Sequence, residues 1–163
     1  YYSTYGIPYT ISNCCNNYGM RQYPEKLIPL MIRNMLAGKT LPIYGNGSNI
    51  REWIFVYDHC EALWGILNHG RIGESYNVGG TDELDNLSLV KLLCSVVSNV
   101  TGNPVEDYLN LITFVDDRKG HDRRYALNCD KILSELGWKA STPLIDGLEK
   151  TVGWELCLVR KER

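Results

Sequence analysis

The sequence lacks the features that would place it in a membrane or attach it to nucleic acid. It has no run near the roughly 18 apolar residues that a membrane-spanning helix needs. Its first residues lack the basic start and apolar centre of a signal peptide. Its 17 basic and 19 acidic side chains give a net charge of −2, too balanced to indicate nucleic-acid or membrane binding. We therefore expect a cytoplasmic protein without a nucleic-acid or membrane partner, in which any anion site is local.

Metal and disulfide patterns are also missing. The six cysteines contain no C-x-x-C pair, and the histidines, His59, His69 and His121, are scattered. Some cysteines lie in apolar segments, as Cys94 does in LLCSVV, where a free thiol behaves as a small hydrophobe. We expect buried or half-buried free thiols of a reducing compartment rather than a disulfide framework, and a zinc site is less expected still.

Three catalytic signatures are absent from the sequence. It has no G-x-x-G-x-x-G turn for a dinucleotide, no Tyr-x-x-x-Lys pair, and no nucleophile elbow of a Ser-His-Asp triad. It also lacks an initiator methionine, and nothing precedes the first expected strand to complete its sheet. We therefore expect a portion of a longer protein, whose own residues suit binding rather than catalysis.

The hydrophobic pattern mixes strands and helices, which predicts an α/β fold. Strands are expected at 9–15, 41–44, 50–56, 74–78 and 111–115, with Asn16-Asn17 as a turn. Helices are expected at 25–37, from Asp58 to Gly70, from Asn86 or Ser88 to Gly102, from Asn128 to Gly137, and from Pro143 to about Val159. The strand at 9–15 is uncharged on both faces, as in a buried parallel sheet.

Two segments near the start carry groups suited to an anionic, ring-bearing ligand. In NNYG (16–19), the Asn16 amide can donate to phosphate or sugar oxygens, although an ordinary Asx turn is the simpler explanation of the motif taken alone. In PEKLIP (24–29), Lys26 is expected in the first turn of a helix, where a cation is favourable only beside an anion. A solvated surface lysine is the alternative.

Two later segments complete the set. In 41–51, Pro42 and Tyr44 form a slot for an aromatic base, and the planar Arg51 guanidinium suits a diphosphate; a hairpin with a core tyrosine is the alternative. In DDRKGHDRRY (116–125), Arg118 and His121 are placed to clamp phosphate, with neighbouring acids orienting them, unless the cluster is a solvated face.

The collinear series NNYG, PEKLIPLMI, LPIYGNG, REWIFVYDH, ESYNVGG, ITFVDDRKGHDRRYALN and LGW resembles the dTDP-glucose 4,6-dehydratases of the extended short-chain dehydrogenase/reductase family. The resemblance spans nearly the whole chain. It implies the carboxyl-terminal part of an extended Rossmann-type α/β dehydratase. Residues 1–19 would be a residual Rossmann strand and loop, and 20–163 a mixed α/β nucleotide-sugar-binding lobe with interleaved late Rossmann elements.

The resemblance also implies the ligands and the residues that hold them. The dTDP-sugar substrate would be bound by Asn16, Lys26, Leu27, Pro42, Tyr44, Arg51, Asn86, Arg118 and His121, with Pro42 and Tyr44 at the thymine and the arginines at the phosphates. Cys14 would lie near the nicotinamide of NAD, which the amino-terminal half mainly binds. That half would also hold the catalytic residues and the homodimer contacts, leaving this portion inactive alone.

Some positions depart from the family pattern: Met20, Asn46, Glu52, Phe55, Lys119 and Glu155. They leave substrate preference open. Two other functions therefore stand beside the NAD-dependent conversion of dTDP-glucose to dTDP-4-keto-6-deoxyglucose and water. One is a non-catalytic nucleotide-sugar-binding module, and the other is a UDP-sugar decarboxylase or epimerase.

Overall fold

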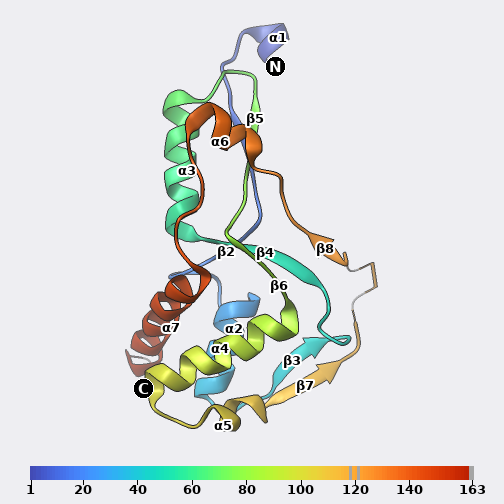
Figure 1. Ribbon diagram of the computed structural model, residues 1–163, viewed down its shortest axis with the longest axis vertical. Helices are drawn as coiled ribbons and strands as arrows, with labels where there is room; N and C mark the ends of the chain where they lie inside the picture. Colours follow the sequence, from blue (N-terminus) through green and yellow to red (C-terminus); the bar gives the residue numbers. More distant parts are fainter. Residues whose placement is uncertain (118, 121, 162–163) are drawn as a thin grey trace.

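The computed structural model describes residues 1–117, 119–120 and 122–161 as an elongated α/β structure (Figure 1). The expected mixture of helices and strands is confirmed. In chain order the elements are α1 (Tyr2–Tyr5), β1 (Ile11–Cys14), β2 (Asn16–Tyr18), α2 (Leu27–Leu36), β3 (Leu41–Tyr44), β4 (Ile50–Phe55), α3 (Val56–His69), β5 (Ser75–Val78), β6 (Asp82–Asp85), α4 (Asn86–Thr101), α5 (Val105–Leu109), β7 (Ile112–Val115), β8 (Arg124–Tyr125), α6 (Asp130–Leu136) and α7 (Leu144–Lys161).

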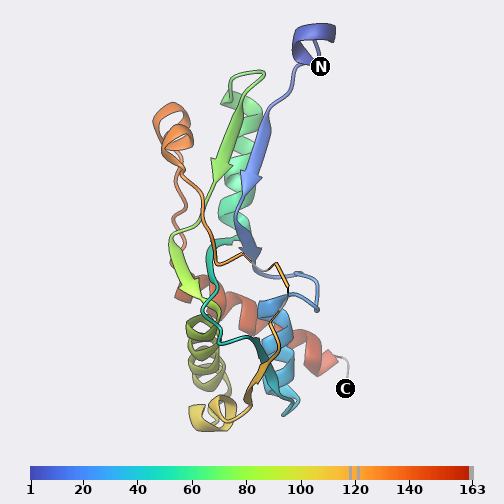
Figure 2. The same ribbon diagram turned by 90° about the vertical axis from the view of Figure 1, so that its right-hand side faces the viewer.

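Within the described ranges, the strands form three small sheets that connect distant parts of the chain. β1 pairs in parallel with β5, and β3 pairs in parallel with β7. β4 is the centre of the third sheet, parallel to β2 and β8 and antiparallel to β6. In both views β1, β5 and α3 lie toward one end of the molecule, and α2, α4 and α7 toward the other (Figures 1 and 2).

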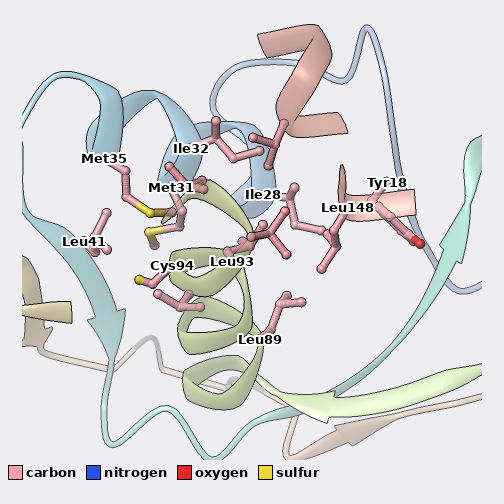
Figure 3. Close-up of a cluster of buried hydrophobic side chains, with 14 of the residues drawn as sticks. Tyr18, Ile28, Met31, Ile32, Met35, Leu41, Leu89, Leu93, Cys94 and Leu148 are labelled. Atoms are coloured by element: carbon pink, nitrogen blue, oxygen red, sulfur yellow. The ribbon is translucent and has the colours of Figure 1, made fainter. Parts of the chain in front are cut away.

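β4 separates two hydrophobic cores. Because side chains alternate along a strand, Trp53 and Phe55 join the larger core of α2, α4 and α7, whereas Ile54 joins a smaller core with α3, β5 and α6. Figure 3 shows the larger core, where the methionines of α2 face α4 and Tyr18 packs beside Leu148. β4 therefore contributes side chains to both cores, one core from each of its faces.

Helical periodicity accounts for the helices around the larger core. In α2, Ile28, Met31, Ile32 and Met35 are buried at the i, i+3, i+4 spacing. α4 begins where the Asp85 side chain accepts a hydrogen bond from the Ser88 backbone N–H at 2.8 Å, and it ends at Gly102 in the left-handed conformation. These two helices bring their N-terminal ends toward β3 and β4.

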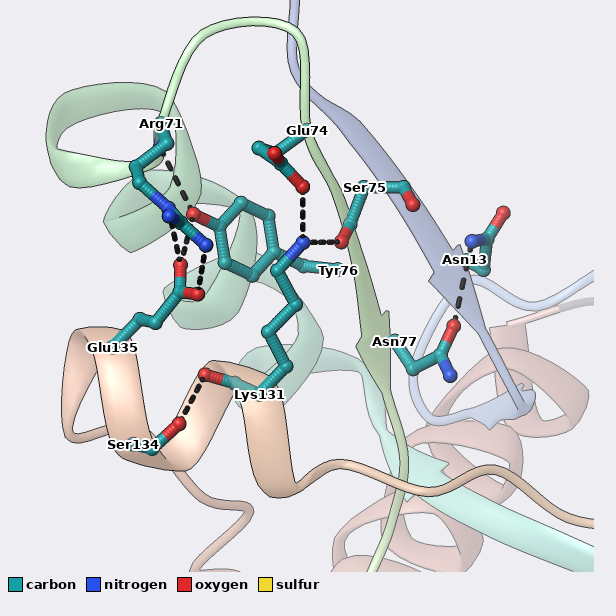
Figure 4. Close-up of polar contacts among 9 residues, drawn as sticks. All are labelled: Asn13, Arg71, Glu74, Ser75, Tyr76, Asn77, Lys131, Ser134 and Glu135. Atoms are coloured by element: carbon teal, nitrogen blue, oxygen red, sulfur yellow. Dashed lines mark hydrogen bonds and ion pairs between the residues drawn. The ribbon is translucent and has the colours of Figure 1, made fainter.

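Polar contacts attach α6 to β5 and to the segment that precedes β5 (Figure 4). Lys131 Nζ lies 2.6 Å from Glu74 Oε2, and the buried Tyr76 hydroxyl donates to Glu135 Oε2 at 2.8 Å. Arg71 forms an ion pair with the same Glu135 carboxylate. The short helix α6 is therefore held by side chains as well as by its single fully buried residue, Ile132.

Several expectations about local structure are wrong. Asn16-Asn17 is not a turn: it belongs to strand β2, because the chain bends at Cys15 and changes its partner from β5 to β4. Lys26 precedes α2 as its N-cap residue instead of lying in the first turn. Asp58 does not begin α3 but lies within its first turn, where it accepts hydrogen bonds from Ser141 and Thr142.

The cysteine prediction is only partly right. All six cysteines are free thiols, and Cys14, Cys15, Cys94 and Cys129 are buried or half-buried as expected, but Cys60 and Cys157 are exposed. Their helices turn those positions to the surface, which the apolar neighbourhood in the sequence does not reveal. Among the described residues, no helix has both the length and the apolar character needed to cross a membrane.

Glu155 carries a partly buried ion pair. Its side chain is 1% exposed and accepts a hydrogen bond at 2.7 Å from Nε of Arg33, which is 28% exposed. We expect Arg33→Leu to lower the free energy of unfolding by about 2–3 kcal/mol, because it leaves the buried carboxylate unpaired.

The double variant Arg33→Leu/Glu155→Leu is its control. It should recover most of that loss, since it removes the unpaired charge and adds apolar contact within the core. Urea unfolding midpoints measure both. A double variant as unstable as Arg33→Leu would contradict the role assigned to this pair.

Candidate functional site

A cavity of about 480 Å³ lies where β3 and β4 meet the N-terminal ends of α2 and α4. This size falls within the range of small-molecule sites. Among its lining residues are seven of those predicted from the sequence: Asn16, Lys26, Leu27, Pro42, Tyr44, Arg51 and Asn86. The fold therefore brings together four separate sequence segments that the resemblance assigned to one ligand.

Strands β3 and β4 position the Tyr44 ring and the Arg51 guanidinium at this cavity. In β3, Leu41 and Ile43 are fully buried, so the alternate residues Pro42 and Tyr44 lie half-buried on the cavity side. In β4, Arg51 reaches the cavity while its Nη2 donates to the carbonyl of Asp122 at 2.9 Å. A flat, partly apolar surface and a guanidinium are thus held on rigid elements.

The cavity also favours negative charge. α2 begins directly after Lys26, where no side-chain cap is seen among the described residues. Unpaired N–H groups and the helix dipole make such ends favourable for anions. Among the described lining residues, Lys26 and Arg51 are two cations, against one acid, Glu25. The local balance is positive, although the whole chain is slightly acidic.

Three predicted site residues are not placed in this cavity. Cys14 lies at the end of β1, where its Sγ accepts a hydrogen bond from Asn17 Nδ2 at 3.2 Å. Arg118 and His121 lie outside the described residues. Their assignments stay predictions, as do the ligand contacts of the seven lining residues.

Sequence reasoning missed four lining residues: Glu25, Leu30, Met31 and Trp53. A signal for three of them was present. Leu30 and Met31 follow Leu27 at the helical spacing, and Trp53 shares the Arg51 face of β4 because strand side chains alternate. Trp53 is 5% exposed and also packs edge-on against Tyr18 in the larger core.

A second cavity, of about 430 Å³, adjoins the first and shares Asn16, Lys26, Leu27 and Trp53 with it. Asn17 and Gln22 add polar groups there, with Gln22 Nε2 donating to the Asn17 carbonyl at 2.8 Å. The second cavity therefore adds a polar extension beside the slot that Pro42 and Tyr44 form.

His59 contacts Asn17, one of the residues that line this extension. Its Nδ1 lies 2.7 Å from Asn17 Oδ1, and the Asn17 amide group donates to the Cys15 carbonyl. Because Asn17 Oδ1 can only accept, Nδ1 of His59 carries the proton. Burial lowers the pKa of His59, which favours this neutral form. The contact fixes the orientation of the Asn17 amide at the cavity edge.

Comparisons with known proteins give one family match and several similar enzymes. The family model described as GDP-mannose 4,6 dehydratase matches residues 1–151. A probable dTDP-glucose 4,6-dehydratase of Sinorhizobium fredii is 54% identical over 153 residues, covering 94% of this chain and 43% of that protein. The dTDP-glucose 4,6-dehydratase of Neisseria gonorrhoeae is 51% identical over 156 residues, covering 94% and 45%.

A solved structure shows the same fold. The dTDP-glucose 4,6-dehydratase of Bacillus anthracis, crystallised in complex with NAD, is 44% identical with a TM-score of 0.84, covering 96% of this chain and 47% of that one. The chain therefore spans less than half the length of each of these relatives.

Proposed function

The chain belongs to the GDP-mannose 4,6-dehydratase family, and on this premise we propose that it is the nucleotide-sugar-binding half of an NAD-dependent dTDP-glucose 4,6-dehydratase. The reaction would convert dTDP-glucose to dTDP-4-keto-6-deoxyglucose and water. The observation that carries the proposal is the positive cavity, which contains an aromatic slot, an arginine and the N-terminal end of α2. The similar enzymes act on the same nucleotide sugar by name.

Each part of the ligand has a matching part of the cavity. We assign the thymine to Pro42 and Tyr44, because a base stacks well on a flat partly apolar surface. The diphosphate goes to Arg51 and the N-terminal end of α2, which offer charge-assisted and backbone hydrogen bonds. Asn16 and Asn86 supply amides for the sugar oxygens.

We propose that Cys14 contacts NAD through its backbone. This residue ends β1 at the carboxyl end of a parallel strand pair, the edge at which open α/β sheets bind ligands, so its position fits a backbone contact to the cofactor. When bound, NAD supplies the hydride acceptor and donor of the reaction. The residues of this chain bind and orient the nucleotide sugar, and the proton transfers are assigned to residues outside it. We also propose that the whole enzyme is a cytoplasmic homodimer.

Thermal protection by nucleotides tests the proposed function. At a concentration about 100 times Kd, a ligand that binds only the folded state stabilises it by about 2.7 kcal/mol. For a protein of this size we expect dTDP to raise Tm by about 5–10 °C. The measurement is a melting curve with increasing dTDP.

Matched nucleotides separate the rival functions. dTDP should protect better than UDP or GDP, whereas a UDP-sugar decarboxylase or epimerase would show the reverse order for UDP. Detection of 4-keto product from dTDP-glucose, with the complete reading frame, distinguishes the enzyme from a binding module. Absence of protection by dTDP would contradict the proposed function.

A further inference from the structure

Glu52 is a buried carboxylate that does not face the candidate cavity. It lies in β4 between Arg51 and Trp53, which both line the cavity, so strand alternation turns it to the opposite face. Its residue is 7% exposed, and burial raises the pKa of its carboxyl. A charged group kept in such a place needs specific partners.

Both oxygens of Glu52 accept backbone hydrogen bonds from segments distant in sequence. Oε1 accepts from the Gly80 N–H at 3.1 Å, and Oε2 accepts from the Leu127 N–H at 2.9 Å. Gly80 lies in the connection from β5 to β6, and Leu127 follows β8. The carboxylate thus joins β4 to two other segments at one point.

The Leu127 contact leads back to Arg51 through a segment that we name the strap, residues 122–127. The Asp122 carbonyl, at the start of the strap, accepts from Arg51 Nη2 at 2.9 Å and from Asn49 Nδ2 at 3.3 Å. The Arg123 carbonyl accepts from the Ile50 N–H at 2.8 Å. Arg51 and Glu52 therefore hold the two ends of the strap.

The Gly80 contact leads to Asn86. After Gly80 the chain forms β6, which pairs antiparallel with β4, and α4 then begins at Asn86 in the cavity wall. The approach at this connection is close, since a Cβ on Gly79 would lie 2.4 Å from Glu52 Oε1. Two cavity residues, Arg51 and Asn86, are thus placed by elements that converge on Glu52.

We propose that Glu52 is a positioning residue for nucleotide binding, which sets the Arg51 guanidinium through the strap and Asn86 through β6. The inference rests on the proposed function and extends it to a residue behind the binding surface. The ionised carboxylate suits this role because one group can accept from two N–H donors at once.

Glu52→Gln tests this role in the complete protein with dTDP as the probe. An amide retains one acceptor oxygen and turns an NH₂ group toward the second N–H, so one backbone donor loses its partner. We expect the Kd for dTDP to rise about 10-fold. Hydrogen exchange at the Leu127 or Gly80 amide should accelerate in the same variant.

Glu83→Gln is the matched control. Glu83 lies directly opposite Glu52 in the β4–β6 register and forms an exposed ion pair with Arg124, 2.7 Å away on the strap. Because water screens an exposed ion pair, the pair contributes little to stability or positioning, and the Kd of Glu83→Gln for dTDP should change less than about 3-fold. Glu52→Asp retains both acceptor oxygens and should recover much of the affinity lost in Glu52→Gln.

Isothermal titration calorimetry separates positioning from simple loss of folded protein, because it reports Kd and the active fraction independently. A lower active fraction with unchanged Kd in Glu52→Gln would overturn the inference, as would equal losses in Glu52→Gln and Glu83→Gln. If the wild-type protein failed to bind dTDP, the proposed function would fall. Hydrogen exchange would then still decide whether Glu52 holds the strap.

Discussion

Arg51→Ala is expected to weaken dTDP binding by about 10- to 150-fold. The guanidinium lines the cavity, and a hydrogen bond to a charged group contributes about 1.5–3 kcal/mol. The change also removes the contact to the Asp122 carbonyl, so the strap loses one of its holds on β4. Calorimetric titration with dTDP measures the effect directly.

Arg160→Ala is the matched control, because Arg160 is exposed in the last turn of α7 and does not line the cavity. It should leave the affinity within about 2-fold, as is usual for surface positions. Arg51→Lys should fall between, since it keeps the charge but loses the planar fork. Equal dTDP affinity in Arg51→Ala and the wild type would contradict the phosphate assignment.

Gly80→Ala is expected to lower the free energy of unfolding by about 3 kcal/mol or more, and Tm by about 6–12 °C. A Cβ at this position would lie 1.7 Å from the Trp53 carbonyl oxygen, so the backbone of the β5–β6 connection would have to move away from β4. The same movement would draw the Gly80 N–H away from Glu52. Urea unfolding measures the change.

Gly153→Ala is the control for that substitution. Gly153 lies within α7, and a Cβ there would meet nothing within 4 Å. Alanine is the better helix former, so this variant should gain about 0.5–1 kcal/mol. A Gly80→Ala protein as stable as the wild type would mean that β4 and the β5–β6 connection are not packed as closely as described.

Much of the local structure was readable from the sequence. Strand β3 and helices α2 and α4 follow from hydrophobic period and from stop signals such as Gly102. β6 was missed because its residues, DELD, have low strand propensity and pair only because β4 lies beside them. α5 was missed as well, since a five-residue helix offers too few periods to detect.

Some residues of the candidate site could likewise be predicted from the sequence, and others could not. Residue chemistry pointed to Tyr44 and Arg51 because an aromatic ring and a planar cation each suit a particular ligand group, whatever their neighbours. The residue type of Glu52 carried no such signal, and Trp53 was indicated only by its alternation with Arg51 along β4. Their roles depend on which face of β4 they occupy and on what the chain brings against that face.

By itself, the sequence determined the α/β class, most helices and the chemistry of the candidate binding residues, since these depend on neighbours a few positions apart. Only the tertiary structure decided that four segments share one cavity, that the chain changes strand partners at Cys15, and that Glu52 joins the Gly80 connection to the strap. These features are long-range pairings. Their free energy arises from surfaces and hydrogen-bond partners that meet only when the whole chain has folded.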